Sequence, residues 1–247
     1  MSIHKTEAII LKTYDFRETS KIVVFFSRDF GKIKGLLKGA RTEPQKFGGF
    51  LGHLSFGEII FYKKKNSELN LVTQFDLKEN LKPLKTDLRV FTLSCYITEL
   101  LDYLMPIEEK NIEIFNLTLD ALKNLRDLKD ADKVFHIFII KLLLLSGFRP
   151  HLDSCLICDS KIKESAKFNF RRGGLVCLRC AATDNYPVKS ILKGTIATIE
   201  HIEDSNWQMS LRLGISPKIR EELNNVLTNF LNFHLEKVPF SSKLLRE

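Results

Sequence analysis

The chain has 247 residues, a length that suggests one large domain or two. Hydrophobic residues make up 44%, which excludes a largely disordered chain, and 38 Lys and Arg against 30 Asp and Glu give a net charge of +8. This basic balance makes polyanions the first partners to consider. The most apolar stretch, 135–147, is interrupted by His136 and Lys141 and is too short to span a bilayer. Because the N-terminus also lacks a secretory signal pattern, we expect a cytoplasmic protein.

Positive charge is concentrated toward the two ends of the chain. Residues 1–80 have a net charge of +5, residues 81–150 are neutral, and residues 151–247 have a net charge of +3. Within the first part, segment 28–65 has nine basic residues against three acidic ones. Such a segment is either a solvated basic face or a surface for nucleic acid.

Residues 6–80 have the composition and alternation of β-strands. Strands are expected at 7–16, 21–27, 32–40, 56–62 and 69–75, and 63–68 is expected to form a hairpin loop. The Gly-rich segment 47–52 interrupts the pattern between the third and fourth strands. Five short strands suggest a small barrel or sandwich, and closure of five antiparallel strands matches an OB-fold.

From Leu81 onward, apolar residues recur at helical spacing. The pattern predicts a first helix that ends at Pro106, followed by helices over 107–125, 131–146, 188–202 and 217–235. Ser216 is expected to cap the last helix, with Pro217 at its first position. Cys95 lies on the apolar stripe of the first helix and is interpreted as a small buried hydrophobe.

Four of the five cysteines form two close pairs. The spacing is C-x2-C-x18-C-x2-C, and the residues are Cys155, Cys158, Cys177 and Cys180. Two CxxC turns can supply four thiolates to one tetrahedral ion, which favours a single structural Zn²⁺. An iron–sulfur centre and a regulatory dithiol remain as alternatives. Four thiolates leave no open coordination position, so the predicted site is structural rather than catalytic.

Catalytic signals are missing from the sequence. It has no GxSxG, HExxH or GxxxxGK[ST] motif, and its six histidines are scattered. We therefore expect a protein that is not an enzyme. The pair Arg171 and Arg172, beside two glycines, could contact phosphate, although surface charge explains the pair equally well.

Three longer motifs follow one another along the chain. The first is the opening TEAIILKTYDFRETSKIVVFFSRDFGKIKGLLKGAR, followed by KFGGFLGHLSFGEI. The second is LLLLSGFRPHLDSCLICDS, and the third is RRGGLVCLRC. By their order and spacing they resemble the RecO family of bacterial DNA repair and recombination-mediator proteins, and with the C-terminal helices the resemblance covers essentially the whole chain. Family members do not all have the cysteines, whereas this chain has all four.

The resemblance implies an α+β protein with an OB-fold at 1–80 and a helical domain at 81–247, in which a zinc module at about 151–185 is inserted. It also implies binding of single- and double-stranded DNA, annealing of complementary strands, and loading of RecA onto strands coated by single-strand-binding protein (SSB). The implied partners are RecR and the acidic C-terminal tail of SSB, and the implied location is the cytoplasm, at the nucleoid.

With this resemblance, we expect the basic segment to form the DNA face of the barrel. Phe47 is interpreted either as a stacking platform for bases or as barrel core. The SSB tail needs basic residues around an apolar pocket, for which Lys133, Lys141 and Arg149 are candidates. The expected nucleic-acid-binding residues are Lys32, Lys34, Lys38, Arg41, Lys46, Phe47, Arg171 and Arg172.

Two other functions fit parts of the same sequence. A zinc-ribbon protein that binds RNA or acts in transcription would use the same basic barrel, and a preference for RNA over DNA would identify it. A zinc hydrolase is the third class, against which the closed set of four cysteines argues.

Overall fold

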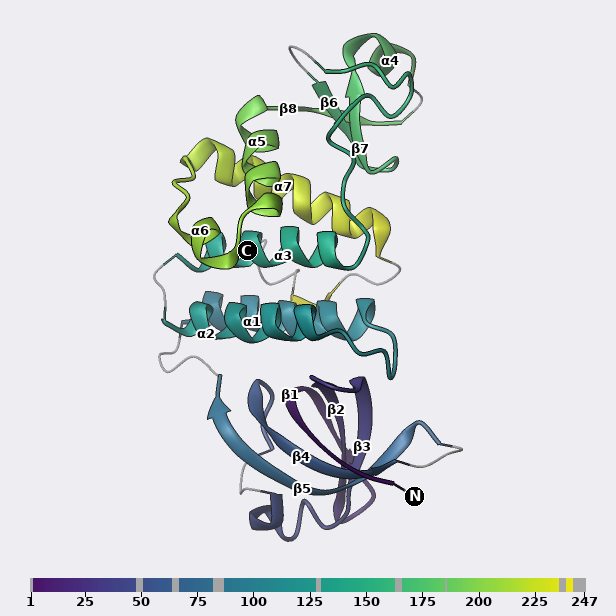
Figure 1. Ribbon diagram of the computed structural model, residues 1–247, viewed down its shortest axis with the longest axis vertical. Coiled ribbons are helices and arrows are strands. Elements are labelled where there is room, and N and C mark those ends of the chain that lie inside the picture. Colours follow the sequence, from purple (N-terminus) through teal and green to yellow (C-terminus); the bar gives the residue numbers. More distant parts are fainter. Residues whose placement is uncertain are drawn as a thin grey trace. The chain divides into compact units, whose positions relative to one another are not determined.

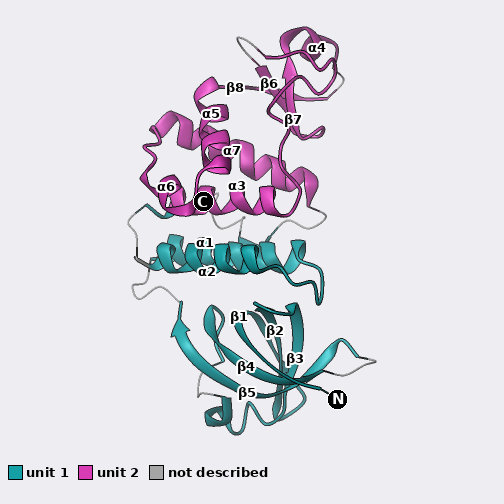
Figure 2. Cartoon of the chain, viewed as in Figure 1, with its two compact units in different colours: residues 1–131, 239–247 teal, residues 132–238 magenta. Residues whose placement is uncertain are grey.

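The computed structural model describes residues 2–47, 51–63, 67–81, 87–127, 130–162, 166–184, 186–235 and 239–241. Parts of the predicted Gly-rich segment and of the predicted hairpin loop lie outside these residues. The chain divides into two compact units, shown in Figure 2: residues 1–131 with 239–247, and residues 132–238. The domain boundary expected near residue 81 stays a prediction.

Unit 1 contains a closed barrel formed, within the described residues, by five strands (Figure 1). Their order is β1-β2-β3-β5-β4, and β1 also pairs with β4 to close the barrel. The β3–β5 pair is parallel, and the other pairs are antiparallel. The sheet is OB-like and confirms the predicted N-terminal barrel. The strands are β1 (Ser2–Phe16), β2 (Ser20–Ser27), β3 (Gly31–Leu37), β4 (Ser55–Lys63) and β5 (Leu69–Asn80).

Alternation along the strands fills the barrel interior. Val23 and Phe25 of β2 belong to the buried core, whereas the residue between them, Val24, lies on the outer face. Gly35 of β3 lies where a Cβ atom would collide with the side chains of Phe25 and Val72. Only glycine allows the backbone to approach these side chains so closely. β1 starts earlier than predicted because its first half, from Ser2, pairs with β4.

Two helices of unit 1 pack against the barrel. α1 (Leu88–Leu104) is capped by Asp87, whose carboxylate accepts hydrogen bonds from the backbone N–H groups of Arg89 and Val90. The helix ends before Pro106, as predicted. α2 (Ile112–Asp127) begins later than the predicted 107, because residue Glu108 donates its N–H to the Lys32 carbonyl of β3, at 2.9 Å. The Phe115 ring of α2 lies 6.0 Å from the Phe26 ring on the outer face of β2.

Unit 2 consists of helices and a small sheet. The last helix begins at Pro217, and the Ser216 hydroxyl accepts the Ile219 N–H, which confirms the predicted cap. Gly147, after the α3 helix, has φ +77°, the left-handed conformation expected for a C-terminal glycine. The helices are α3 (Ala131–Leu145), α4 (Leu178–Thr183), α5 (Lys193–Asp204), α6 (Trp207–Arg212) and α7 (Pro217–His234).

The small sheet was not predicted. β6 (Ala166–Asn169) lies between β7 (Gly174–Cys177) and β8 (Val188–Ile191), with both pairs antiparallel. The predicted helix 188–202 is therefore wrong in its first part: residues 188–191 pair with β6, and α5 begins only at Lys193. None of the helices that the structure describes combines the length and the hydropathy needed to cross a bilayer.

Candidate metal centre and nucleic-acid interface

The four cysteines of the two CxxC motifs converge in unit 2. Their sulfur atoms all lie within 4.8 Å of one another, and the Cys158 and Cys177 sulfurs are 3.8 Å apart. In a tetrahedral site with Zn–S bonds of about 2.3 Å, neighbouring sulfurs are also about 3.8 Å apart. The four cysteines therefore form one candidate metal site, as the spacing predicted.

Two structural elements position these sulfurs. Cys155 and Cys158 occupy a tight turn in which the Asp159 N–H donates to the Cys155 carbonyl at 2.8 Å, and Asp159 has φ +53°. Cys177 ends β7 and precedes α4, which contains Cys180. The Leu156 N–H donates to the Leu175 carbonyl of β7 at 2.9 Å, so the turn is held against the hairpin.

Hydrogen bonds prepare the sulfurs for a cation. The Ser160 hydroxyl lies 3.1 Å from the Cys158 sulfur and, with the Ser160 backbone, lowers the pKa of Cys158 to about 6. The backbone at Cys180 lowers the pKa of Cys177. Cys180 stays protonated beside the other sulfurs, with Cys158 first among the causes that raise its pKa to about 12. A bound metal ion would remove the proton of Cys180, because a coordinating thiol is deprotonated.

Two further candidate residues, His151 in unit 2 and Cys95 in unit 1, do not belong to the cluster. The His151 ring lies 2.9 Å from the Ser154 hydroxyl, which donates to the Asp159 carboxylate at 2.7 Å. His151 therefore helps to stabilise the turn that contains Cys155 and Cys158. Cys95 belongs to α1 in unit 1 and is half-buried rather than buried as predicted, with its sulfur 3.8 Å from His53 Nδ1. Ser160 was missed by the sequence analysis, and only its place two residues after Cys158 could have suggested it.

The predicted DNA face of the barrel is not one continuous surface. Lys32 is buried, and its ammonium donates to the Asp102 carbonyl at 2.5 Å and lies 3.5 Å from the Asp102 carboxylate. Lys32 therefore does not lie on an exposed DNA face, because its ammonium is buried against α1, where it shares the Asp102 carboxylate with Lys12. Lys34 is half-exposed and is 3.2 Å from Glu68.

The other predicted barrel residues follow β3. Lys38 and Lys46 are exposed and form no ion pair with any described residue. Arg41 is also exposed, and its guanidinium donates to the Arg17 carbonyl at 2.9 Å and lies 3.6 Å from Asp15. Phe47 is only 1% exposed and belongs to the barrel core. Of its two interpretations, barrel core is therefore correct, because a buried ring cannot stack on a base.

The arginine pair of unit 2 stands at the turn between β6 and β7. The Arg171 guanidinium lies 4.3 Å from the centre of the Tyr186 ring, and that of Arg172 lies 5.2 Å from it. Arg172 also contacts the carboxylate of Asp184 at 3.3 Å. Arg171 forms no ion pair with a described residue. Tyr186 and Asp184 had no sequence signal, because the fold brings them to the turn from beyond α4.

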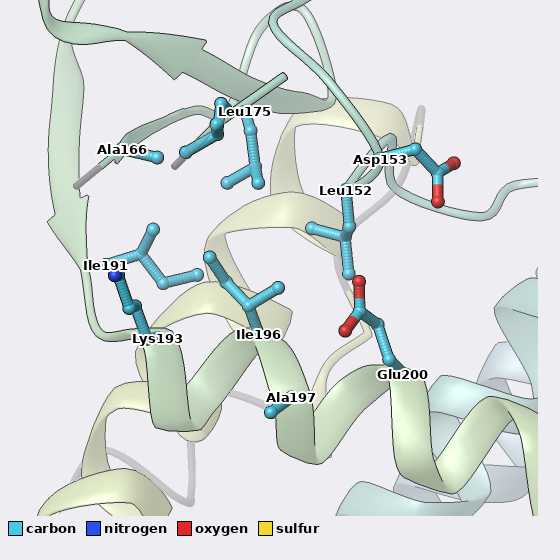
Figure 3. A pocket seen from close by; sticks show the side chains of 10 residues that line it. Leu152, Asp153, Ala166, Leu175, Ile191, Lys193, Ile196, Ala197 and Glu200 are labelled. Carbon is cyan, nitrogen blue, oxygen red and sulfur yellow. The ribbon is translucent and has the colours of Figure 1, made fainter. Parts of the chain in front are cut away.

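An open pocket of about 370 Å³ lies between the small sheet and α5 (Figure 3). Its walls are about equally polar and apolar and include Leu175 and Ile196, with Lys193 on one side and Asp153 and Glu200 on the other. Two cations considered for the SSB tail are engaged elsewhere. Lys141 donates to the carbonyls of Ile202 and Ser205, and Arg149 lies 2.8 Å from Glu203.

Comparison with known proteins covers the chain from end to end. Residues 1–81 match the family model described as Recombination protein O N terminal, and residues 85–244 match Recombination protein O C terminal. The chain is 31% identical to DNA repair protein RecO of Desulforamulus reducens over 241 residues, which are 96% of this chain and 91% of that protein. It is 28% identical to DNA repair protein RecO of Alkaliphilus metalliredigens over 242 residues, 96% of each chain.

The two family models, the full-length relatives, the OB-like barrel and the four-cysteine site agree with one another. Members of this family are recombination mediators rather than enzymes. The chain belongs to the RecO family of DNA repair proteins.

Proposed function

We propose that this protein binds single- and double-stranded DNA, anneals complementary strands and, with RecR, helps to load RecA onto DNA coated by SSB. The single observation that supports this most is the match of both RecO family models over nearly the whole chain. Its site of action would be the cytoplasm, at the nucleoid. No nucleotide hydrolysis is needed, because annealing follows from charge neutralisation on a basic surface.

The cations that follow β3 are the best candidates for phosphate contacts in unit 1. Lys38 and Lys46 have no ion pair among the described residues, so binding DNA would not require them to leave a protein carboxylate. Lys34 and Arg41 would exchange exposed ion pairs with Glu68 and Asp15 for phosphate, at small cost. In unit 2, the Arg171 guanidinium packs against the Tyr186 ring and forms no ion pair with a described residue. Arg171 is therefore also a candidate for a phosphate contact.

The metal held by the four cysteines is proposed to be one structural Zn²⁺. The sulfur spacing matches tetrahedral Zn–S bonding, and Zn²⁺ prefers thiolate ligands. When bound, the ion would link the Cys155–Cys158 turn to β7 and α4, so that its binding energy becomes folding energy for the small sheet.

The proposed protein partners are RecR and the C-terminal tail of SSB, with RecA affected indirectly. The pocket beside α5 offers the apolar surface that the apolar end of such a tail needs. Its rim is mixed, however: Lys193 would attract the acidic tail, whereas Asp153 and Glu200 would repel it. These charges do not favour the pocket as the binding site of the tail. Charge-reversal variants of surface cations, tested for binding of a tail peptide, would locate that site.

Annealing of two complementary oligonucleotides, each coated with SSB from the same organism, tests the proposed function. The reaction is followed with and without the protein, and without nucleotide. Faster annealing supports the mediator function. No acceleration by folded, metal-loaded protein would contradict it, and tighter binding of RNA than of DNA of equal length would then favour the RNA-binding alternative.

A further inference from the structure

Four apolar side chains form a row on the outside of the barrel, which we call the outer row: Tyr14, Ile22, Leu36 and Leu71. Each is paired in register with the next, from β1 through β2 and β3 to β5. Core residues such as Val23, Leu37 and Val72 are their neighbours along the strands and point inward. By alternation, the outer row therefore points outward.

The outer row is accessible. Tyr14 is 51% exposed, and Ile22, Leu36 and Leu71 are half-buried rather than buried. The part of the same outer surface around Phe26 and Lys32 differs, because helices of unit 1 cover it: Phe26 packs on Phe115, and Lys32 is paired with Asp102. Unit 1 thus covers this part of the β2–β3 face and leaves the outer row partly exposed to solvent.

Cations surround the Tyr14 end of the row. Phe16 lies on the same face two residues after Tyr14, and the Arg17 guanidinium is 5.2 Å from the centre of its ring. Lys38 directly follows Leu37, the last residue of β3, and Leu37 pairs with Lys21 of β2. Arg17 and Lys38 form no ion pair with described residues, whereas the nearby carboxylate of Asp15 is already engaged by Lys21 at 2.7 Å.

We propose that the outer row is a stacking surface for the bases of single-stranded nucleic acid, with Tyr14 as its principal platform. The proposal rests on the DNA-binding function proposed above and names the side chains that contact bases rather than phosphates. An apolar surface bordered by unpaired cations complements an unpaired strand, whose base faces are apolar and whose backbone is anionic. Three strand spacings of about 4.8 Å give the row a length of about 14 Å, enough for a few bases.

The test replaces Tyr14 and compares two oligonucleotides of equal length, oligo(dT) and an abasic strand with the same phosphates. Tyr14→Leu should raise the Kd for oligo(dT) roughly five- to a hundredfold, the loss of one base–aromatic stack. Its Kd for the abasic strand should stay unchanged, as should the salt dependence. Tyr14→Phe keeps the ring and should bind oligo(dT) like the wild type. The matched control is Tyr103→Leu, an exposed tyrosine on α1 outside the row.

A measurement on the wild-type protein avoids any effect of substitution on folding. Photo-crosslinking to an oligonucleotide with 5-iododeoxyuridine should label the tryptic peptide that spans residues 13–17, which contains Tyr14 and Phe16. Unchanged oligo(dT) affinity of folded Tyr14→Leu, or crosslinks confined to other peptides, would overturn the outer row as a base-binding surface while leaving DNA binding intact. Failure of the wild type to bind either strand would instead contradict the proposed function itself.

Discussion

At the scale of single residues, Glu79 shows how one carboxylate connects the barrel to a helix. Its oxygens lie 2.6 Å from the Arg126 guanidinium and 3.2 Å from the Lys123 ammonium, so β5 is tied to α2. Burial alone would raise the pKa of Glu79, but hydrogen bonds from Arg126 and Lys123 outweigh it and hold the pKa below the ordinary 4.5. A carboxylate with a lowered pKa stabilises the folded state above pH 4.5 and loses this contribution as the pH falls through its folded pKa.

Glu79→Gln should therefore destabilise the protein at pH 7 and much less in acid. A charged hydrogen bond of this kind contributes about 1–2 kcal/mol, which corresponds to a Tm lower by roughly 2–8 °C. Thermal unfolding followed by circular dichroism at pH 7 and pH 3.5 measures the difference. Glu68→Gln is the control, because its pair with Lys34 is exposed and should contribute little at either pH. An equal Tm difference at both pH values would show that the charge of Glu79 is not responsible.

Residue-level prediction from sequence succeeded where local spacing determines the chemistry. The two CxxC turns predicted the metal site because each turn places its sulfurs by itself, and only the approach of the turns depends on the fold. For the opposite reason, Lys32 was expected on an exposed DNA face, and Phe47 was left undecided between a stacking platform and barrel core. Whether a lysine meets Asp102, or a phenylalanine enters the barrel, depends on residues distant in sequence, which neither charge nor hydropathy along the chain reveals.

At the scale of secondary-structure elements, the cations expected to contact phosphate lie on β3 and on the connection after it, and their contribution to DNA binding can be measured. Lys34, Lys38, Arg41 and Lys46 are the barrel cations left for phosphate once Lys32 is engaged by α1. Four phosphate contacts predict a slope of log affinity against log salt of about −2.8 on single strands, or a loss of about fiftyfold between 50 and 200 mM salt.

Replacing Lys38 and Lys46 together by Gln should halve that slope to about −1.4, since two of the four contacts are lost. Fluorescence anisotropy of labelled oligo(dT) at several salt concentrations gives both slopes. Lys5→Gln serves as the control, because Lys5 is paired with Glu58 at 2.8 Å and belongs to the first half of β1. A double variant with the wild-type slope would exclude this connection from the DNA contacts.

Elements with a clear period were predictable, and short paired strands were not. The barrel strands alternate strongly, and α1 and α7 have identifiable ends at Pro106 and Ser216. In contrast, residues 188–191 form a strand only because β6 is beside them, and β6 in turn pairs with β7. Strands of only four residues leave no periodic pattern that a sequence window could detect.

At the scale of the whole molecule, the two units differ in what holds them together. Unit 1 has a closed barrel with a continuous buried core, including Phe25, Phe61 and Phe75. The small sheet of unit 2 has strands of four residues and four sulfurs within 4.8 Å. We therefore expect the small sheet to depend on a metal held by these sulfurs, whereas the barrel is stabilised by apolar burial.

Metal removal should therefore affect the two units unequally. Chelation should release one equivalent of Zn²⁺ per chain, lower the unfolding temperature of a transition assigned to unit 2, and leave the barrel folded, because no metal site lies in the described part of unit 1. Cys177→Ser should act in the same way, while Cys95→Ser, outside the cluster, should retain the metal. Metal analysis, calorimetry and oligo(dT) binding together measure these effects.

Oligo(dT) binding that survives metal loss would assign the main strand contacts to the barrel and a structural role to the metal, because the outer row and the cations after β3 do not depend on the cysteines. Binding lost together with the metal, in a protein whose barrel remains folded, would instead place essential DNA contacts in unit 2, where Arg171 and Tyr186 would be the first residues to replace.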